Sequence, residues 1–119
     1  MNELTKRVEQ WYRENRERLD KHFSKTEFTD KTAWDPLRGA VHIALWGSAI
    51  LATITVWNKG DICAQALTVE GKEISTIEDR VLNQNEDIAA LLDSVLKRFS
   101  QLIRTTEGHR STDARPSED

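Results

Sequence analysis

Residues 54–69, ITVWNKGDICAQALTV, contain two segments of alternating residues on either side of a short turn. β-branched and apolar residues recur at every second position, which predicts two antiparallel strands. The turn, Asn58-Lys59-Gly60, suits a three-residue hairpin loop in which Gly60 adopts the left-handed conformation. Placing Trp57 opposite Asp61 gives the hairpin one wholly apolar face, whose alanines leave room for a helix to approach closely. The pairs on that face are then Val56 with Ile62, Ile54 with Ala64, and Ala52 with Ala66.

The other face of this hairpin is chemically mixed. It carries Thr53, Thr55, Cys63 and Gln65, bordered by Leu51, Leu67 and Trp57. Because polar side chains occupy its centre, we expect this face to be only partly covered by the rest of the chain.

Segments on both sides extend the hairpin into a sheet of three to four antiparallel strands. AVHIALW, residues 40–46, has a strand period, and Gly47-Ser48 permits a turn into the strand that ends at Trp57. After a turn at residues 70–72, EISTI could form a fourth strand. Ser75 followed by Glu78 also resembles a helix start, so residues 74–84 are either a strand or the beginning of a helix.

Helical patterns occupy the two ends of the chain. An apolar stripe with Asn15 as its only polar break predicts a helix over about residues 3–24, and residues 29–37, TDKTAWDPL, then predict a loop. The stripe consists of Leu4, Val8, Trp11, Tyr12, Leu19 and Phe23. A second stripe predicts a C-terminal helix and consists of Ile88, Leu91, Leu92, Val95, Leu96, Phe99, Leu102 and Ile103.

The limits of the C-terminal helix follow from its flanking residues. Asn83 can cap it, Glu86 lies three residues on as in a capping box, and Asp87 favours the positive helix end. Residues 105–119 are expected to form a disordered tail. The prediction is one α+β domain over residues 1–104, in which an N-terminal and a C-terminal helix pack on one face of an antiparallel sheet.

Composition limits the class of protein. A chain of 119 residues is long enough for one core, and its net charge of −3 argues against nucleic acid as the main partner. The single cysteine excludes an intrachain disulfide, and no stretch has the length of a membrane span or the apolar character of a signal peptide. We therefore expect a cytoplasmic protein without a membrane or nucleic-acid partner.

Residues capable of chemistry do not form a recognisable catalytic or metal-binding set. His22, His42 and His109 belong to different elements, and Cys63 is predicted in mid-strand opposite Thr55. Structural roles are expected for His42 and Cys63. No glycine-rich phosphate loop is present, and the adjacent carboxylates at 78–79 and 86–87 do not share a face. The sequence predicts no enzyme, no cofactor and no catalytic residue.

Acidic residues are concentrated in one part of the chain. Residues 61–93 contain eight acids and two bases, the latter being Lys72 and Arg80. Turns and helix starts favour acids, which is one explanation. The other is an acidic surface that steers a basic protein partner. The acids are Asp61, Glu70, Glu73, Glu78, Asp79, Glu86, Asp87 and Asp93.

The order of these features resembles that of the TriTu-type immunity proteins, which are small bacterial proteins of interbacterial toxin systems. The resemblance covers about residues 50–100, from ITVWNKGDICAQALTVEGKEI to LLDSVLKRF. It comprises a strand ending in tryptophan, two turns with glycine, a strand of small and apolar residues, and a leucine-rich terminal helix. The matching positions are Trp57, Gly60, Asp61, Leu67, Val69, Gly71, Ile88, Leu91, Leu92 and Leu96.

The resemblance implies an immunity protein of a contact-dependent or type VI toxin system. It would bind the catalytic domain of its cognate toxin one to one and block substrate access. The toxin implied by the TriTu name is an ADP-ribosyltransferase acting on elongation factor Tu, although related immunity proteins neutralise other toxins. The alternatives are an adaptor or chaperone-like binding module, and a small enzyme that uses Cys63 or His42. From the residues themselves we expect toxin contacts at Asp61, Glu70, Glu73, Glu78, Asp79, Thr53, Thr55 and Gln65.

Overall fold

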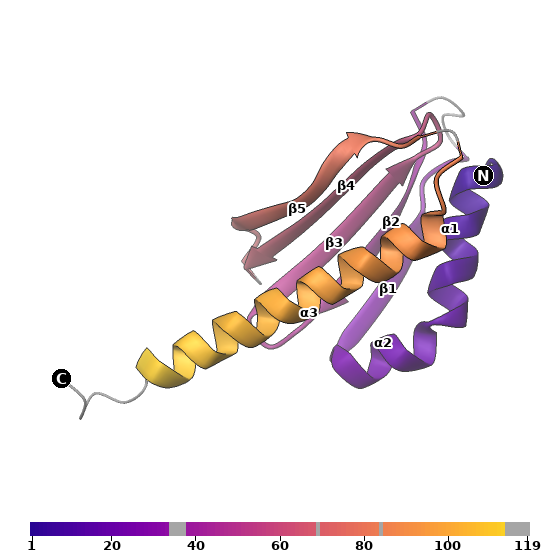
Figure 1. The fold of residues 1–119 in the computed structure, drawn as a ribbon. Coiled ribbons are helices and arrows are strands. Elements are labelled where there is room, and N and C mark those ends of the chain that lie inside the picture. Colours follow the sequence, from indigo (N-terminus) through magenta and orange to yellow (C-terminus); the bar gives the residue numbers. More distant parts are fainter. Residues whose placement is uncertain (34–37, 69, 84, 114–119) are drawn as a thin grey trace.

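The computed structural model describes residues 1–33, 38–68, 70–83 and 85–113, with side chains up to residue 104. It is an α+β fold in which each strand pairs antiparallel with the next, in the order β1-β2-β3-β4-β5 (Figure 1). The strands are β1 (Lys25–Asp30), β2 (Ala40–Trp46), β3 (Ile50–Trp57), β4 (Asp61–Thr68) and β5 (Glu73–Val81). The helices are α1 (Glu3–Glu14), α2 (Arg16–His22) and α3 (Ile88–Asp113), and all three lie on one face of the sheet.

The register predicted for the central hairpin is confirmed. β3 pairs with β4 so that Val56 faces Ile62, Ile54 faces Ala64 and Ala52 faces Ala66, and all six residues are buried. Gly60 has a φ of 110°, which a residue with a side chain rarely adopts. The hairpin turn is bonded to the start of α1, because the side chain of the N-cap residue Asn2 donates from Nδ2 to the Asn58 carbonyl oxygen at 2.6 Å.

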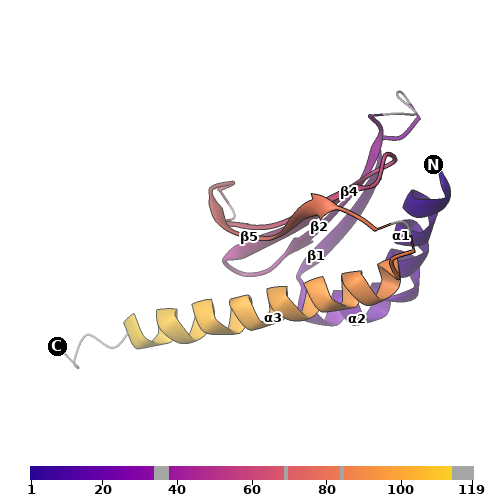
Figure 2. The same ribbon diagram turned by 45° about the horizontal axis from the view of Figure 1, so that its top comes forward.

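The core lies between the apolar face of the sheet and the helices. Leu92, Val95 and Phe99 of α3 have no exposed surface and belong to the same buried cluster as the alanines of β3 and β4. Figure 2 shows α3 crossing below the sheet, with α1 and α2 beside it. The small side chains at Ala52 and Ala64 allow the helical layer to pack closely on this part of the sheet.

The first strand departs from the sequence prediction. Residues 25–30 form β1, so Thr29 and Asp30 lie in a strand, where a loop over 29–37 was expected. KTEFTD contains one large apolar residue, Phe28, and therefore shows no apolar period. Its strand conformation comes from pairing with β2, with Phe28 opposite Ile43. The rest of the expected loop includes residues 34–37, which lie outside the described residues.

The helix predicted over residues 3–24 is divided into α1 and α2 at Asn15, the one polar residue of its apolar stripe. Asn15 has φ −104° and ψ 5°, and its Nδ2 donates to the Trp11 carbonyl oxygen at 2.8 Å. An asparagine side chain bonded to the backbone competes with helix continuation. The chain turns there, and Leu19 and Phe23 still reach the core.

The segment after β4 is a strand, which settles the choice left open at residues 74–84. β5 runs from Glu73 to Val81, and its pairing with β4 is irregular at two places, between Ala64 and Gln65 and between Ala66 and Leu67. An extra residue at each place bends the strand and increases its twist. β5 therefore curves along the edge of the sheet (Figure 1).

Helix α3 begins later and ends later than expected. It starts at Ile88, and Asp87 caps it by accepting from the Ala90 backbone N–H at 3.1 Å. Glu86 does bond back to the Asn83 N–H at 3.1 Å, but Asn83 lies in a turn before the helix. The helix continues to Asp113, where a tail from residue 105 was expected, and residues 114–119 lie outside the described part.

Candidate protein-binding surface

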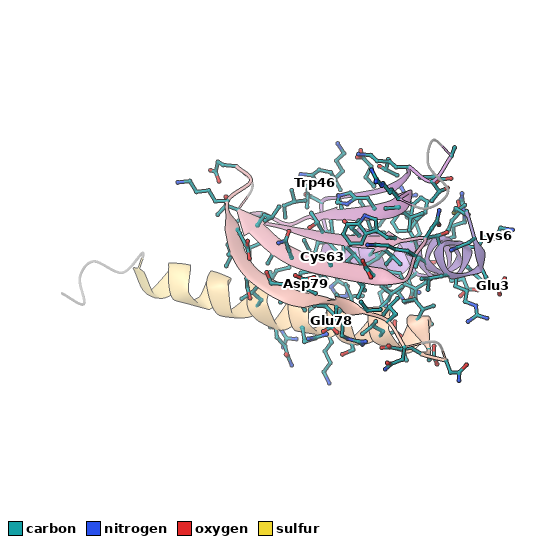
Figure 3. All side chains as sticks on the ribbon, turned by 90° about the horizontal axis from the view of Figure 1, so that it is seen from above. Glu3, Lys6, Trp46, Cys63, Glu78 and Asp79 are labelled. Atoms are coloured by element: carbon teal, nitrogen blue, oxygen red, sulfur yellow. The ribbon has the colours of Figure 1, made fainter. Side chains whose placement is uncertain are left out.

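No described helix covers the face of the sheet opposite α1, α2 and α3. Alternate residues of every strand point to this face, which we call the open face (Figure 3). Trp46 and Cys63 lie on it, both partly exposed. Its side chains form rows that run across the strands, because the registers of neighbouring strands align them.

One row of the open face is apolar and has a charge at each end. Trp46 lies opposite Leu51, and Leu51 opposite Leu67, across β2, β3 and β4. All three are partly exposed. Lys25 of β1 faces Trp46, with its Nζ 4.8 Å from the centroid of the indole ring, and Glu73 of β5 faces Leu67. We call these five residues the apolar row.

A partly exposed tryptophan flanked by leucines is the type of group that dominates binding energy at protein interfaces. Leu51 and Leu67 were predicted to border this face, whereas Trp46 and Lys25 were not among the predicted contacts. The alternation in AVHIALW places Trp46 on the side of His42 and could have identified it. The pairing of Lys25 could not be predicted, since β1 itself was missed.

The centre of the open face is polar. Thr53, Thr55 and Gln65, three of the predicted contacts, are each partly exposed there. Thr53 Oγ1 donates to the Gln65 carbonyl oxygen at 3.5 Å, and His42 Nδ1 lies 2.9 Å from Thr55 Oγ1. Hydroxyl and amide groups that retain solvent contact can form the direct hydrogen bonds that protein interfaces contain.

The two groups with possible nucleophilic or basic character are not activated. Burial raises the pKa of the Cys63 thiol, and the carboxylates of Asp79 and Glu73 raise it further, so the thiol stays protonated. Burial lowers the pKa of His42, and the charge of Lys31 lowers it further, whereas Glu27 acts in the opposite direction. Within the described ranges, no group of three or more His, Cys, Asp or Glu side chains could hold a metal ion.

The predicted acidic contacts fall into two groups. Glu70, Glu73 and Asp79 are exposed at the β5 side of the molecule, and Glu73 accepts from Thr76 Oγ1 at 2.6 Å. Asp61 is half-buried and forms an ion pair with Lys59 at 3.0 Å. These four carboxylates remain accessible to a partner, and Asp79 lies opposite Cys63 on the open face.

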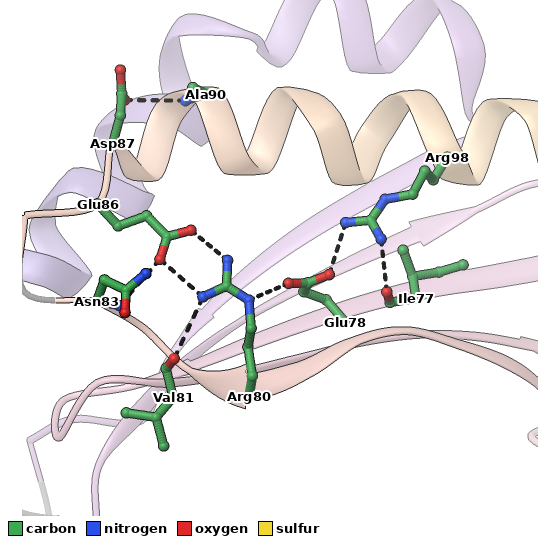
Figure 4. Close-up of polar contacts among 9 residues, drawn as sticks. All are labelled: Ile77, Glu78, Arg80, Val81, Asn83, Glu86, Asp87, Ala90 and Arg98. Atoms are coloured by element: carbon green, nitrogen blue, oxygen red, sulfur yellow. Dashed lines mark hydrogen bonds and ion pairs between the residues drawn. The ribbon is translucent and has the colours of Figure 1, made fainter.

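Glu78 differs from the other acids, because its side chain points toward the helices. Arg98 of α3 donates from Nη2 to Glu78 Oε1 at 2.9 Å and from Nη1 to the Ile77 carbonyl oxygen at 2.9 Å (Figure 4). Arg80 donates from Nε to the second Glu78 oxygen and pairs with Glu86 through both Nη atoms. This ion-pair network ties β5 to α3 and to the turn before it, so Glu78 is engaged within the fold.

The charges in this network reinforce one another. The hydrogen bond from Arg80 lowers the pKa of Glu78, and Arg98 contributes in the same direction. Arg80 and the Asn83 backbone N–H lower the pKa of Glu86, and the two carboxylates raise the pKa of Arg80. All three groups are therefore charged at neutral pH.

The described residues form a small α+β fold in which no described helix covers one face of the sheet. The family profile "Immunity protein TriTu" matches residues 6–98, from α1 into α3. The chain belongs to the TriTu immunity protein family. No curated protein and no solved structure matches it significantly. None of the described helices has the length and apolar character needed to cross a membrane.

Proposed function

We propose that this immunity protein neutralises a cognate interbacterial toxin by binding its catalytic domain through the open face and blocking substrate access. Membership of an immunity family over residues 6–98 carries the proposal that the partner is a toxin. The absence of described elements over the open face supports that face as the contact surface. The protein acts in the cytoplasm, one molecule per toxin, and performs no chemistry.

Three features of the open face favour a protein partner over a small ligand. The apolar row supplies a hydrophobic contact near one end of the strands, Thr53, Thr55 and Gln65 supply hydrogen-bonding groups at the centre, and the exposed acids at β5 supply a charged margin. An interface of standard size needs about 800 Å² from each partner. A five-stranded sheet face provides an area of this order, since its strands lie about 4.8 Å apart and rise about 3.3 Å per residue.

The toxin is expected to be a contact-dependent or type VI effector, and an ADP-ribosyltransferase acting on elongation factor Tu is the candidate suggested by the family name. The first test searches the genes adjacent to this one for a secreted toxin and uses the catalytic domain of that toxin. Co-expression should restore growth of cells that produce the toxin, and the purified protein should abolish toxin activity at one equivalent. Incubation with elongation factor Tu and labelled NAD then determines whether the blocked activity is ADP-ribosylation.

Two results would contradict the proposal. The first is protection without a complex detectable by calorimetry. The second is a complex in which the toxin keeps its full activity, as an adaptor would give. A control surface is available on α1 and α2, where reversal of Glu3, Glu14 and Glu17 to Lys changes exposed charges away from the open face. That triple variant should inhibit the toxin as the wild type does.

A further inference from the structure

A second surface lies in the helical layer, in a groove between α2 and α3. Its volume is about 690 Å³. The apolar part of its lining comes from Ile103, which is partly exposed, and from the edges of the buried Phe23 and Leu96, and the charged part includes Arg18, Lys97 and Arg104. We call it the α2–α3 groove. It contains no residue of the open face, and the sheet separates the two surfaces (Figure 2).

Two cations of this groove, Lys97 and Arg104, differ from most other cations of the helical layer, which form ion pairs. On α1 and α2 the arginines at 7, 13 and 16 each pair with a carboxylate four residues away on the same helix. Lys97 and Arg104 of α3 are exposed, and neither has an ion-pair partner among the described side chains. They project about two turns apart along the helix, since seven residues separate them.

The one carboxylate in the groove lining is already occupied. Asp93 Oδ1 accepts from the Trp11 indole N–H at 3.0 Å and from Arg18 Nη2 at 3.0 Å. The charge of Asp93 is balanced by that of Arg18, so the described lining keeps a net positive charge from Lys97 and Arg104. This charge lies beside a partly apolar floor.

We propose that the α2–α3 groove binds an acidic amphipathic helix of a protein partner. A groove between two helices accommodates the apolar face of a third helix, with anchors at spacings of three, four and seven residues. The seven-residue separation of Lys97 and Arg104 matches that repeat, so carboxylates on such a helix can meet both cations. The sequence carries a net charge of −3, and electrostatic attraction at this groove is therefore local and specific to the patch.

The lining of the α2–α3 groove favours a peptide ligand over a nucleic acid. Phe23 is 4% exposed and cannot stack on a base, which leaves His22 as the exposed ring of the lining, whereas sites for single strands stack successive bases on several aromatic side chains. Two unpaired cations also neutralise few phosphates, whereas nucleic-acid sites rely on many such contacts. A partner bound at the open face leaves the groove accessible, so this inference does not depend on the toxin proposal.

The test uses a labelled synthetic peptide of about 18 residues, with leucines on one face of a helix and glutamates on the other. Fluorescence anisotropy measures its binding to the full chain at low salt. The double variant Lys97→Glu/Arg104→Glu should weaken binding by about tenfold or more, because two favourable charge pairs become repulsive. Lys6→Glu/Lys72→Glu makes the same change in net charge at exposed sites outside the groove and should weaken binding less than twofold.

A second peptide tests the apolar floor without risk to the fold. Its leucines are replaced by serines at unchanged charge, and it should bind about tenfold more weakly or not at all. Equal weakening by the two double variants would overturn the proposal, since attraction would then be non-specific. Equal binding of the serine peptide, or tighter binding of a single-stranded RNA of the same length, would also overturn it.

Discussion

The surroundings of Cys63 and His42 favour the uncharged form of each side chain. Cys63 faces Thr55 and Asp79 across the strands on either side of it, and acidic neighbours disfavour its thiolate. His42 is half-buried against Thr55, and its lowered pKa keeps it neutral at physiological pH. Both residues thus contribute packing and hydrogen bonding to the open face.

The first prediction is that neither residue performs chemistry. Cys63→Ala and His42→Gln should each leave growth protection within a few-fold of the wild type, because neither side chain is activated. Protection, melting temperature and toxin affinity are measured together. A variant that folds and binds normally but no longer protects would show that the side chain acts chemically.

The second prediction concerns Trp46 in the apolar row. Trp46→Ala should weaken toxin binding by about 1–3 kcal/mol, that is by roughly fivefold to 150-fold, because it removes a large apolar anchor. Trp46→Phe keeps an aromatic face for Lys25 and should retain most of the affinity. Calorimetry measures the affinity of both variants, and their melting temperatures serve as the control. Unchanged affinity in Trp46→Ala would remove the apolar row from the interface.

At the scale of secondary-structure elements, α3 holds the molecule together from two sides. Its buried side chains belong to the same apolar core as the alanines of the hairpin, and its Arg98 bonds to the edge strand β5. The first contact is apolar and independent of pH. The second depends on charged carboxylates.

The apolar contact leads to the third prediction. Leu92 is fully buried, and Leu92→Ala should lower the free energy of unfolding by about 2–5 kcal/mol through loss of packing and a residual cavity. Ser94→Ala, an exposed position two residues away on the same helix, is the control and should change stability little. Urea titration measures both. A Leu92→Ala variant as stable as the wild type would exclude α3 from the core.

The ion-pair network leads to the fourth prediction. The folded-state pKa values of Glu78 and Glu86 lie below the ordinary value of 4.5, so the unfolded chain binds protons first as the pH falls. Their contribution to stability is present above pH 4.5 and is lost as the pH falls through the lower folded-state pKa values. Glu78→Gln should cost about 1–3 kcal/mol at pH 7 and reduce the acid-dependent loss of stability.

Unfolding curves at several pH values between 3 and 7 provide the measurement. Glu73→Gln is the matched control, because Glu73 is exposed and has no arginine partner among the described residues. If the stability of Glu78→Gln and wild type fell in parallel below pH 4.5, the network would not be the source of the pH dependence.

Elements with a strong internal pattern could be predicted from the sequence. The alternation around Asn58 gave the β3–β4 register, and the apolar stripe from Ile88 identified α3. β1 could not be predicted, because its strand conformation depends on β2 and its sequence has one large apolar residue. The internal role of Glu78 could not be predicted either, since Arg98 lies 20 residues away and only the fold brings the two together.

For the whole molecule, charge has different signs on its two candidate surfaces. Glu70, Glu73 and Asp79 lie toward β5, and Lys97 and Arg104 lie in the α2–α3 groove. The net charge is small, but the acidic and basic groups lie on different surfaces. This separation of charge can orient the molecule as a partner approaches. Such steering acts mainly on the association rate and weakens as salt screens it.

The fifth prediction tests this steering with the toxin domain. Reversal of Glu70, Glu73 and Asp79 to Lys should slow association at low salt by about tenfold, with a smaller effect at high salt and an unchanged fold. Glu78 is left intact, because its reversal would break the ion-pair network. Surface-binding kinetics at two salt concentrations give the rates. Equal rates in variant and wild type at both salts would make these acids ordinary solvated residues and leave the polar centre and apolar row as the contact.

The irregular pairing of β5 with β4 also affects how copies of this protein behave toward one another. A straight, unpaired strand edge is a template on which further chains can polymerise into fibrils. The two extra residues in β5 interrupt the regular spacing of its outward backbone groups, and the exposed charges of Glu73 and Asp79 add repulsion between copies. The chain can therefore accumulate to high concentration without growing into aggregates through this edge.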